Sequence, residues 1–225
     1  MSKIKLIFPI MLWASLINSA NISAATIDFE TIPGGTPSDG LSISTQFLAS
    51  EGVSFSLEGG GNPVLAQVGD PRTAFQGYNL LPDQPAPGTN AGQFFLTDDG
   101  VVGAPPLALL IDYSSPVSAA SGIILDIDGT EEWTIEALDD SGGLLSSLIL
   151  GPNNTLDGSA TVWSFNLGSS AIKRIRFEYT GDQNVVGLAF DNFSPSSAVP
   201  IPPALWLFGS GLLGLIGISR HKKSS

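Results

Sequence analysis

The chain has 225 residues, of which 21 are acidic and nine basic, and its formal net charge is −12 at pH 7. All 21 acids lie between residues 26 and 198 with only four basic residues, so this part carries −17. Such a charge repels nucleic acid and anionic membranes and favours cation binding or contact with neutral polymers. There is no cysteine, and the one histidine is His221. Thiol catalysis, a Ser-His-Asp triad and a His- or Cys-ligated zinc site are therefore excluded for residues 26–198.

The first 25 residues have the layout of a secretory signal peptide. Lys3 and Lys5 precede an apolar run over residues 6–17, and a small-residue stretch ends at Ala25. A basic start, an apolar core of about a dozen residues and small side chains before the cut are typical of such signals. We expect cleavage between Ala25 and Thr26. The alternative is an N-terminal membrane anchor, for which the apolar run is short.

Residues 26–193 predict one all-β domain. Short apolar alternations are separated by Gly, Pro, Asn, Asp and Ser, and helical periodicity is nearly absent apart from one candidate turn at 44–49. This regular spacing of strands favours an antiparallel two-sheet sandwich that is jelly-roll-like. Residues 59–90 are predicted to form long loops, with one short strand expected at residues 64–68. The expected strands are 26–30, 53–57, 64–68, 107–112, 121–126, 133–138, 144–150, 160–166, 172–179 and 187–193.

Acidic residues gather at the two ends of this domain. Asp28 and Glu30 open the first expected strand, and Asp191 and Asn192 lie in the last. The first and last strands of a sandwich often lie side by side, and calcium takes about six to eight oxygen ligands. The sequences IDFE and AFDNF also resemble calcium-bearing jelly-roll carbohydrate-binding modules, which implies a calcium site at these residues. The alternative is a group of solvated or hydrogen-bonded acids.

A second acidic stretch, DIDGTEE, covers residues 126–132. It begins like an EF-hand loop, but the twelfth position is Ala137 and no helix follows. We interpret it as a hairpin turn at Asp128-Gly129. Glu131, Glu132 and Glu136 are the candidates for a glycosidase pair, but adjacent strand residues point to opposite faces, so we expect no enzyme activity.

Aromatic side chains could give the domain a sugar-binding surface. Trp133 and Trp163 lie in alternating strands, which favours packing in the core over stacking on a glycan. Tyr78, in the loop sequence FQGYN, is the more accessible candidate for ligand contact. A carbohydrate-binding module that recognises exopolysaccharide is therefore the alternative function.

The end of the chain has a three-part pattern. A short linker and a Pro-rich motif occupy residues 194–203, an apolar span follows at 204–218, and a basic cluster closes the chain. At about 1.5 Å per residue the span is about 22 Å long, short of the bilayer core of about 30 Å. The basic cluster is expected to stay in the cytoplasm, with the acidic domain outside. Its topology-determining residues are Arg220, Lys222 and Lys223.

This pattern resembles the PEP-CTERM family of bacterial sorting signals, in the variant that begins Val-Pro-Leu-Pro-Ala. The matching apolar residues are ALWLFGSGLLG at 204–214, but Ile201 stands where the namesake motif has Glu, and Pro203 is additional. The resemblance implies that an exosortase, a membrane peptidase, cleaves near the motif in a Gram-negative host that makes exopolysaccharide. The motif residues are Val199, Pro200, Ile201, Pro202, Pro203 and Ala204.

From this resemblance we expect a precursor anchored in the inner membrane by residues 204–225, with a periplasmic domain. After processing, the protein would reach the cell surface or the extracellular matrix, in association with exopolysaccharide or biofilm. A plain C-terminal anchor without processing is the alternative, although such an anchor needs no proline motif and is usually longer.

Overall fold

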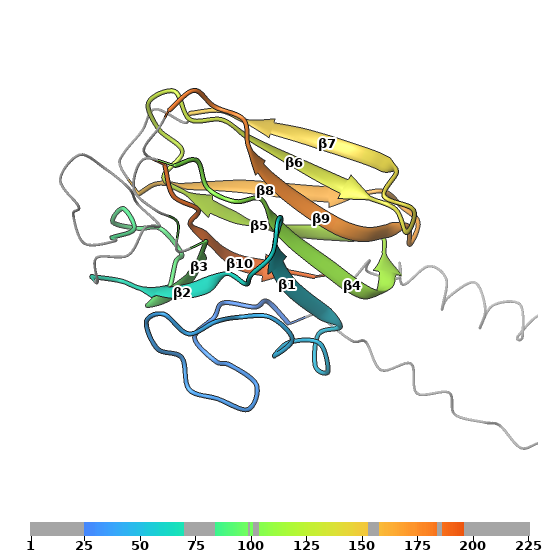
Figure 1. Ribbon diagram of the computed structural model, residues 1–225, viewed down its shortest axis with the longest axis horizontal. Helices are drawn as coiled ribbons and strands as arrows, with labels where there is room; N and C mark the ends of the chain where they lie inside the picture. The colour runs from blue at the N-terminus through green and yellow to red at the C-terminus, as the bar shows by residue number, and fades with distance from the viewer. Residues whose placement is uncertain are drawn as a thin grey trace, which may run out of the picture.

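The computed structural model describes residues 25–69, 84–98, 100, 104–152, 158–183 and 186–195. These residues form two five-stranded antiparallel sheets that pack face to face (Figure 1). The predicted all-β sandwich is therefore confirmed. The described residues contain no helix long and apolar enough to cross a membrane. Most of the signal peptide, Tyr78, the sorting motif and the apolar span lie outside the described residues.

Each sheet combines strands from distant parts of the chain. Most connections cross from one sheet to the other, as in jelly-roll-like sandwiches, whereas β2–β3 and β6–β7 pair within a sheet. The first sheet has the order β1 (Val53–Leu57), β4 (Leu109–Val117), β9 (Ile172–Tyr179), β6 (Trp133–Leu138) and β7 (Leu144–Leu150). The second has the order β2 (Val64–Gln67), β3 (Phe94–Thr97), β10 (Phe190–Ser194), β5 (Ala119–Leu125) and β8 (Ala160–Asn166).

An aromatic cluster fills the space between the sheets. Trp163 is 2% exposed, and its ring stacks on Phe193 with centroids 6.2 Å apart and planes at 22°. Phe177 from the opposite sheet meets the same indole edge-on at 5.0 Å. A Cβ at Gly122, which pairs with Trp163 on β5, would come within 3.1 Å of the indole ring. Trp133 is also buried, so the prediction that both tryptophans pack in the core is confirmed.

The strand prediction is confirmed for most of the sandwich, with three corrections. β1, β6, β7, β8 and β9 have the expected bounds. Residues 26–30 form a single bridge at Ile27 rather than a strand. At residues 44–49, where one helical turn was expected, Leu48 donates its N–H to the Thr45 carbonyl at 3.0 Å within a hydrogen-bonded turn. β3 was not predicted. The turn at Asp128-Gly129 is not a hairpin, because it connects β5 and β6, which lie in different sheets.

Loops cover one side of the sandwich. The blue segment in Figure 1, residues 25–52, runs beside β2 and β1. Leu65 of β2 donates its N–H to the Leu41 carbonyl at 2.9 Å, and Phe55 of β1 donates to the Ser44 carbonyl at 2.8 Å. The outer edges of β1 and β2, which would otherwise offer unpaired backbone groups, are thus partly satisfied by this segment.

Candidate functional site

The N-terminal segment is fastened to the last strand at one point. Ile27 donates its N–H to the Phe193 carbonyl at 2.7 Å, and Phe193 returns a bond to Ile27 at 2.9 Å. Both side chains are buried in the core. The expected pairing of the first and last segments is confirmed by this bridge. It brings Asp28 to the same end of the sandwich as Asp191.

Asp191 is a fully buried carboxylate in this region. Its Oδ2 accepts a hydrogen bond from the Gly92 N–H at 3.3 Å, and its Oδ1 accepts one from the Asn192 N–H at 2.7 Å. Burial, together with the negative charges of Asp28 and Glu30, raises the pKa of Asp191 to about 7, although the two backbone hydrogen bonds lower it in part. The site therefore lacks enough positive charge to keep Asp191 ionised under acidic conditions.

A third segment, the loop before β3, completes the site. Glu30 Oε1 accepts the Phe94 N–H at 2.9 Å, and the Asn192 amide donates to the Asn90 carbonyl at 2.6 Å. A Cβ at Gly92 would lie 2.0 Å from Glu30 Oε1, so any larger residue there would displace that carboxylate. No sequence pattern predicts a role for this loop, because it contributes mainly backbone groups.

Two residues of the site have a left-handed backbone. Phe29 has φ of 58° and Asn192 has φ of 52°. Asn tolerates this region, but a bulky side chain such as Phe adopts it only at a cost of about 1–3 kcal/mol. Such residues gather where the surrounding structure holds a ligand or a tight contact. Here they flank the bridge between the chain ends.

The meeting of the chain ends places oxygen-bearing side chains at one end of the sandwich, but these side chains are not arranged as a metal centre. Among the described residues, no three or more His, Cys, Asp or Glu side chains are close enough to hold a metal ion. Calcium prefers oxygen ligands and accepts backbone carbonyls as well as side-chain oxygens. The side-chain oxygens at this end come from Asp28, Glu30, Asp191 and Asn192. A calcium ion here would therefore draw on main-chain oxygens as well.

The described basic side chains of the domain have partners elsewhere. Arg174 pairs with Asp112 at 2.7 Å, and Arg176 contacts Glu58 at 2.7 Å, both on the first sheet. Lys173 donates to the Ser114 carbonyl at 3.0 Å. These cations stabilise the outer face of the first sheet, and none of their described contacts is with Asp191.

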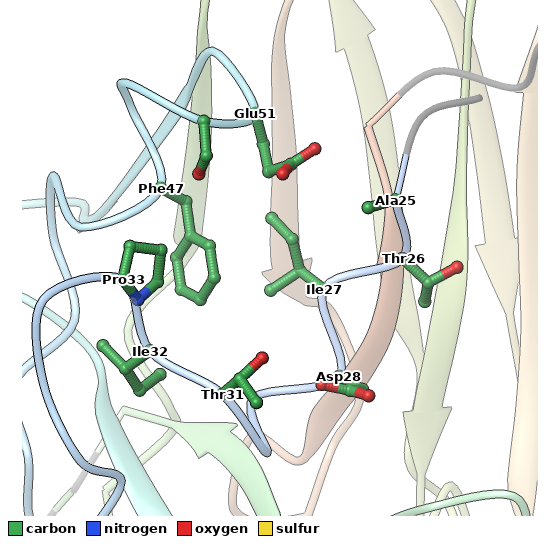
Figure 2. Close-up of a pocket in the computed structure, with 10 residues that line it drawn as sticks. Ala25, Thr26, Ile27, Asp28, Thr31, Ile32, Pro33, Phe47 and Glu51 are labelled. Atoms are coloured by element: carbon green, nitrogen blue, oxygen red, sulfur yellow. The ribbon is translucent and has the colours of Figure 1, made fainter. Parts of the chain in front are cut away.

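A small pocket lies beside the N-terminal segment. It has a volume of about 280 Å³, and Figure 2 shows the Ile27 side chain pointing toward the Phe47 ring across it. Its acidic lining residues are Asp28 and Glu51. The pocket therefore has an apolar wall and an acidic rim, next to the expected cleavage position at Ala25.

The three glutamates considered for glycoside hydrolysis have separate partners. Glu136 pairs with Arg176 at 3.2 Å, whereas Glu132 accepts a hydrogen bond from the Thr180 hydroxyl at 3.1 Å. Glu131 is buried and lies 3.4 Å from the Asp128 N–H. None of the three lines the pocket described above.

The exposed large apolar side chains in the described part of the chain are aliphatic. No aromatic ring is among them, and of the described aromatic residues Phe94 and Tyr179 are partly exposed. Tyr78, the predicted ligand contact, lies outside the described residues. The exposed side chains are Leu48, Leu107, Leu144, Leu145, Ile149 and Val162.

No protein-family model and no curated protein matches the chain. Among solved structures, it is similar to the K1 cleaved adhesin domain of Lys-gingipain from Porphyromonas gingivalis W83, with 12% identity, a TM-score of 0.37, and coverage of 63% of this chain and 88% of that one. The K2 adhesin domain of Lys-gingipain gives 7% identity, a TM-score of 0.42, and coverage of 75% and 96%. The CBM22-1–GH10 modules of Clostridium thermocellum xylanase 10B give 12% identity, a TM-score of 0.36, and coverage of 76% and 27%.

Proposed function

We propose that this chain is an exported β-sandwich protein of the cell surface or extracellular matrix, sorted through its PEP-CTERM-like tail. The observation that carries the proposal is the ordered pattern of Pro motif, short apolar span and basic cluster over residues 199–223. The fold adds support at the other end, because Ile27, two residues after the expected cut, is already bonded to the last strand. The protein acts by binding or by its structure, not by catalysis.

Maturation tests this proposal at both ends. Intact-mass measurement of the protein from cells that have an exosortase should give a species that begins at Thr26 and ends near Ala204. In a strain without the exosortase, the protein should keep its tail and remain in the membrane fraction. A species that carries Lys222 and Lys223 but is found outside the membrane would refute sorting through the tail.

We also propose that calcium binds where the chain ends meet, at Asp28, Glu30, Asp191 and Asn192. The fully buried Asp191, with two further acids near it, favours a cation there because burying uncompensated negative charge is costly. Calcium would supply the positive charge that holds the N-terminal segment to β10.

The alternative function is calcium-dependent binding of the producer's own exopolysaccharide. A domain of this charge tolerates a neutral polymer, and Tyr78 is an aromatic residue in the loop sequence FQGYN, outside the expected strands. Electrophoresis through a gel that contains the exopolysaccharide should then retard the protein, and Tyr78→Ala should abolish the retardation. Equal mobility with and without the polymer would eliminate this alternative.

A further inference from the structure

The pocket beside the N-terminal segment contains the residue that the expected cut makes the first of the mature chain. Thr26 and Glu51 both line it, and Figure 2 shows the Glu51 carboxylate pointing toward the side of the pocket where Ala25 lies. In the uncleaved chain the Thr26 nitrogen belongs to a neutral peptide bond. Hydrolysis of that bond leaves a carboxylate on Ala25 and an α-amino group on Thr26, which is mostly protonated at pH 7.

The position of the Thr26 nitrogen is fixed by the next residue. Ile27 donates its N–H to the Phe193 carbonyl at 2.7 Å and accepts the Phe193 N–H at 2.9 Å. Successive residues of an extended segment direct their N–H groups to opposite sides, so the Thr26 nitrogen points away from β10. None of the described residues that line the pocket belongs to β10. The Thr26 nitrogen and the pocket therefore lie on the same side of the N-terminal segment.

Glu51 has a carboxylate with no described partner. Its N–H bonds to the Phe47 carbonyl at 2.9 Å, which holds the residue in the turn at residues 46–51. The side chain is half-buried, and no described group donates a hydrogen bond to it or pairs with its charge. The other acid of the pocket, Asp28, already accepts the Glu30 N–H at 3.1 Å. A partly buried carboxylate without a counter-charge favours a cation beside it.

The described basic side chains do not supply this cation. All of them belong to β9 and have partners on the first sheet. The α-ammonium group that cleavage creates is therefore a new positive charge at a pocket that has an unpaired acid. It also enters a region, residues 26–198, that otherwise carries −17, so its attraction to a neighbouring carboxylate is strong. The basic side chains of β9 are Lys173, Arg174 and Arg176.

We propose that the α-ammonium group of Thr26, formed when the signal peptide is removed, binds the Glu51 carboxylate in this pocket. The inference rests on the proposed export, because only a chain cut after Ala25 carries the group. The N-terminal segment is bridged to β10 of the second sheet, whereas Glu51 lies in the turn that precedes β1 of the first sheet. The ion pair therefore links the two sheets in the exported protein and is absent from its precursor.

Periodate tests the ion pair without a substitution. It oxidises the amino alcohol of an N-terminal threonine, breaks the bond between Cα and Cβ, and replaces the ammonium group with an uncharged aldehyde. The mature chain has no cysteine and no methionine to compete, because Met1 and Met11 leave with the signal peptide. The protein is purified from exporting cells in mild detergent, and its intact mass establishes that it begins at Thr26. In EDTA, oxidation should lower the melting temperature by about 1 to 3 °C, as expected for a partly exposed ion pair.

Two variants identify the carboxylate. Glu51→Gln keeps the shape of the side chain and should melt at the lower temperature before oxidation, with no further fall after it. Asp28→Asn changes the other acid that lines the pocket and should keep the full response to periodate. EDTA keeps calcium out of both measurements, and circular dichroism should show that both variants are folded.

The failures of this inference and of the proposed export are distinguishable. A protein that begins at Thr26 but melts at the same temperature before and after oxidation would overturn the ion pair and leave export intact. A response that persists in Glu51→Gln and disappears in Asp28→Asn would also overturn it, because the ammonium group would then bind Asp28. A mature chain that begins at another residue would overturn both the ion pair and the expected cut.

Discussion

Calcium at millimolar concentration is expected to raise the melting temperature of the protein by about 5 to 10 °C at pH 8. A ligand that binds only the folded state stabilises it by about 2.7 kcal/mol at a hundredfold excess over its Kd. For a domain of this size, each kcal/mol shifts the melting temperature by about 2–4 °C. The effect should be large because the ion would add a second link between the N-terminal segment and β10, which are otherwise joined by the bridge between Ile27 and Phe193. Magnesium should be less effective, because it demands tighter octahedral geometry.

The same site gives the calcium effect a pH dependence. The pKa of Asp191 is raised to about 7 in the folded protein, above the value of about 3.9 for an unfolded chain. Between these two pH values the folded state binds the proton of Asp191 more tightly than the unfolded chain does. Without calcium, the stability that this difference contributes is therefore fully present below about pH 4. It is lost as the pH rises to about 7. Calcium needs the ionised carboxylate, so its stabilisation should be far weaker at pH 5 than at pH 8.

Two substitutions locate this effect. Asp191→Asn should remove both the response to calcium and most of the pH dependence, and Glu30→Gln should weaken the response. Asp182→Asn, which removes a charge from an exposed turn, should respond to calcium as wild type does. Melting curves that overlay with and without calcium at pH 8 would mean that these acids form no cation site.

The strands that could be predicted from sequence are those with one face in the core. In β6, Trp133, Ile135 and Ala137 are buried and alternate with half-buried residues, so the period-two pattern is explicit. β3 lacks this pattern because both of its faces are covered. Leu96 lies in the main core, whereas Phe95 lies in a separate apolar cluster with Ile123 on the other face of the same sheet. A short apolar run of this kind has no alternation to identify it.

Part of the candidate site could likewise be predicted from the sequence, and part could not. The meeting of Asp28 with Asp191 followed from the tendency of first and last strands to be neighbours, and the bridge at Ile27 provides it. The contribution of Gly92 could not be predicted, because a backbone N–H has no side-chain signature. The Asp-Gly pair at residues 128 and 129 favours a hairpin turn, but local turn chemistry does not determine which sheet the next strand enters.

Trp163→Ala is expected to destabilise the protein by about 3–5 kcal/mol, the range found for truncating large buried aromatic residues. The indole is 2% exposed and contacts the rings of Phe177, Phe190 and Phe193, so it joins β8 to both sheets of the core. The backbone of Gly122 forms the remaining wall and cannot move in to fill the cavity without breaking the β5–β8 ladder. Because whole domains are stable by only about 5–15 kcal/mol, this variant should be close to unfolding at growth temperature.

Thermal unfolding monitored by circular dichroism measures this loss, which corresponds to a fall in melting temperature of about 6 to 20 °C. The control is Ser164→Ala, one residue along β8 on the exposed face of the strand. This substitution should change the melting temperature by no more than about 2 °C. Trp163→Phe should lose less than Trp163→Ala, because the indole Nε1 is buried with no hydrogen-bond partner in the described structure, and Phe removes that unpaired donor while keeping a ring. If Trp163→Ala had the same melting temperature as Ser164→Ala, the aromatic cluster would not be the packed centre that joins the two sheets.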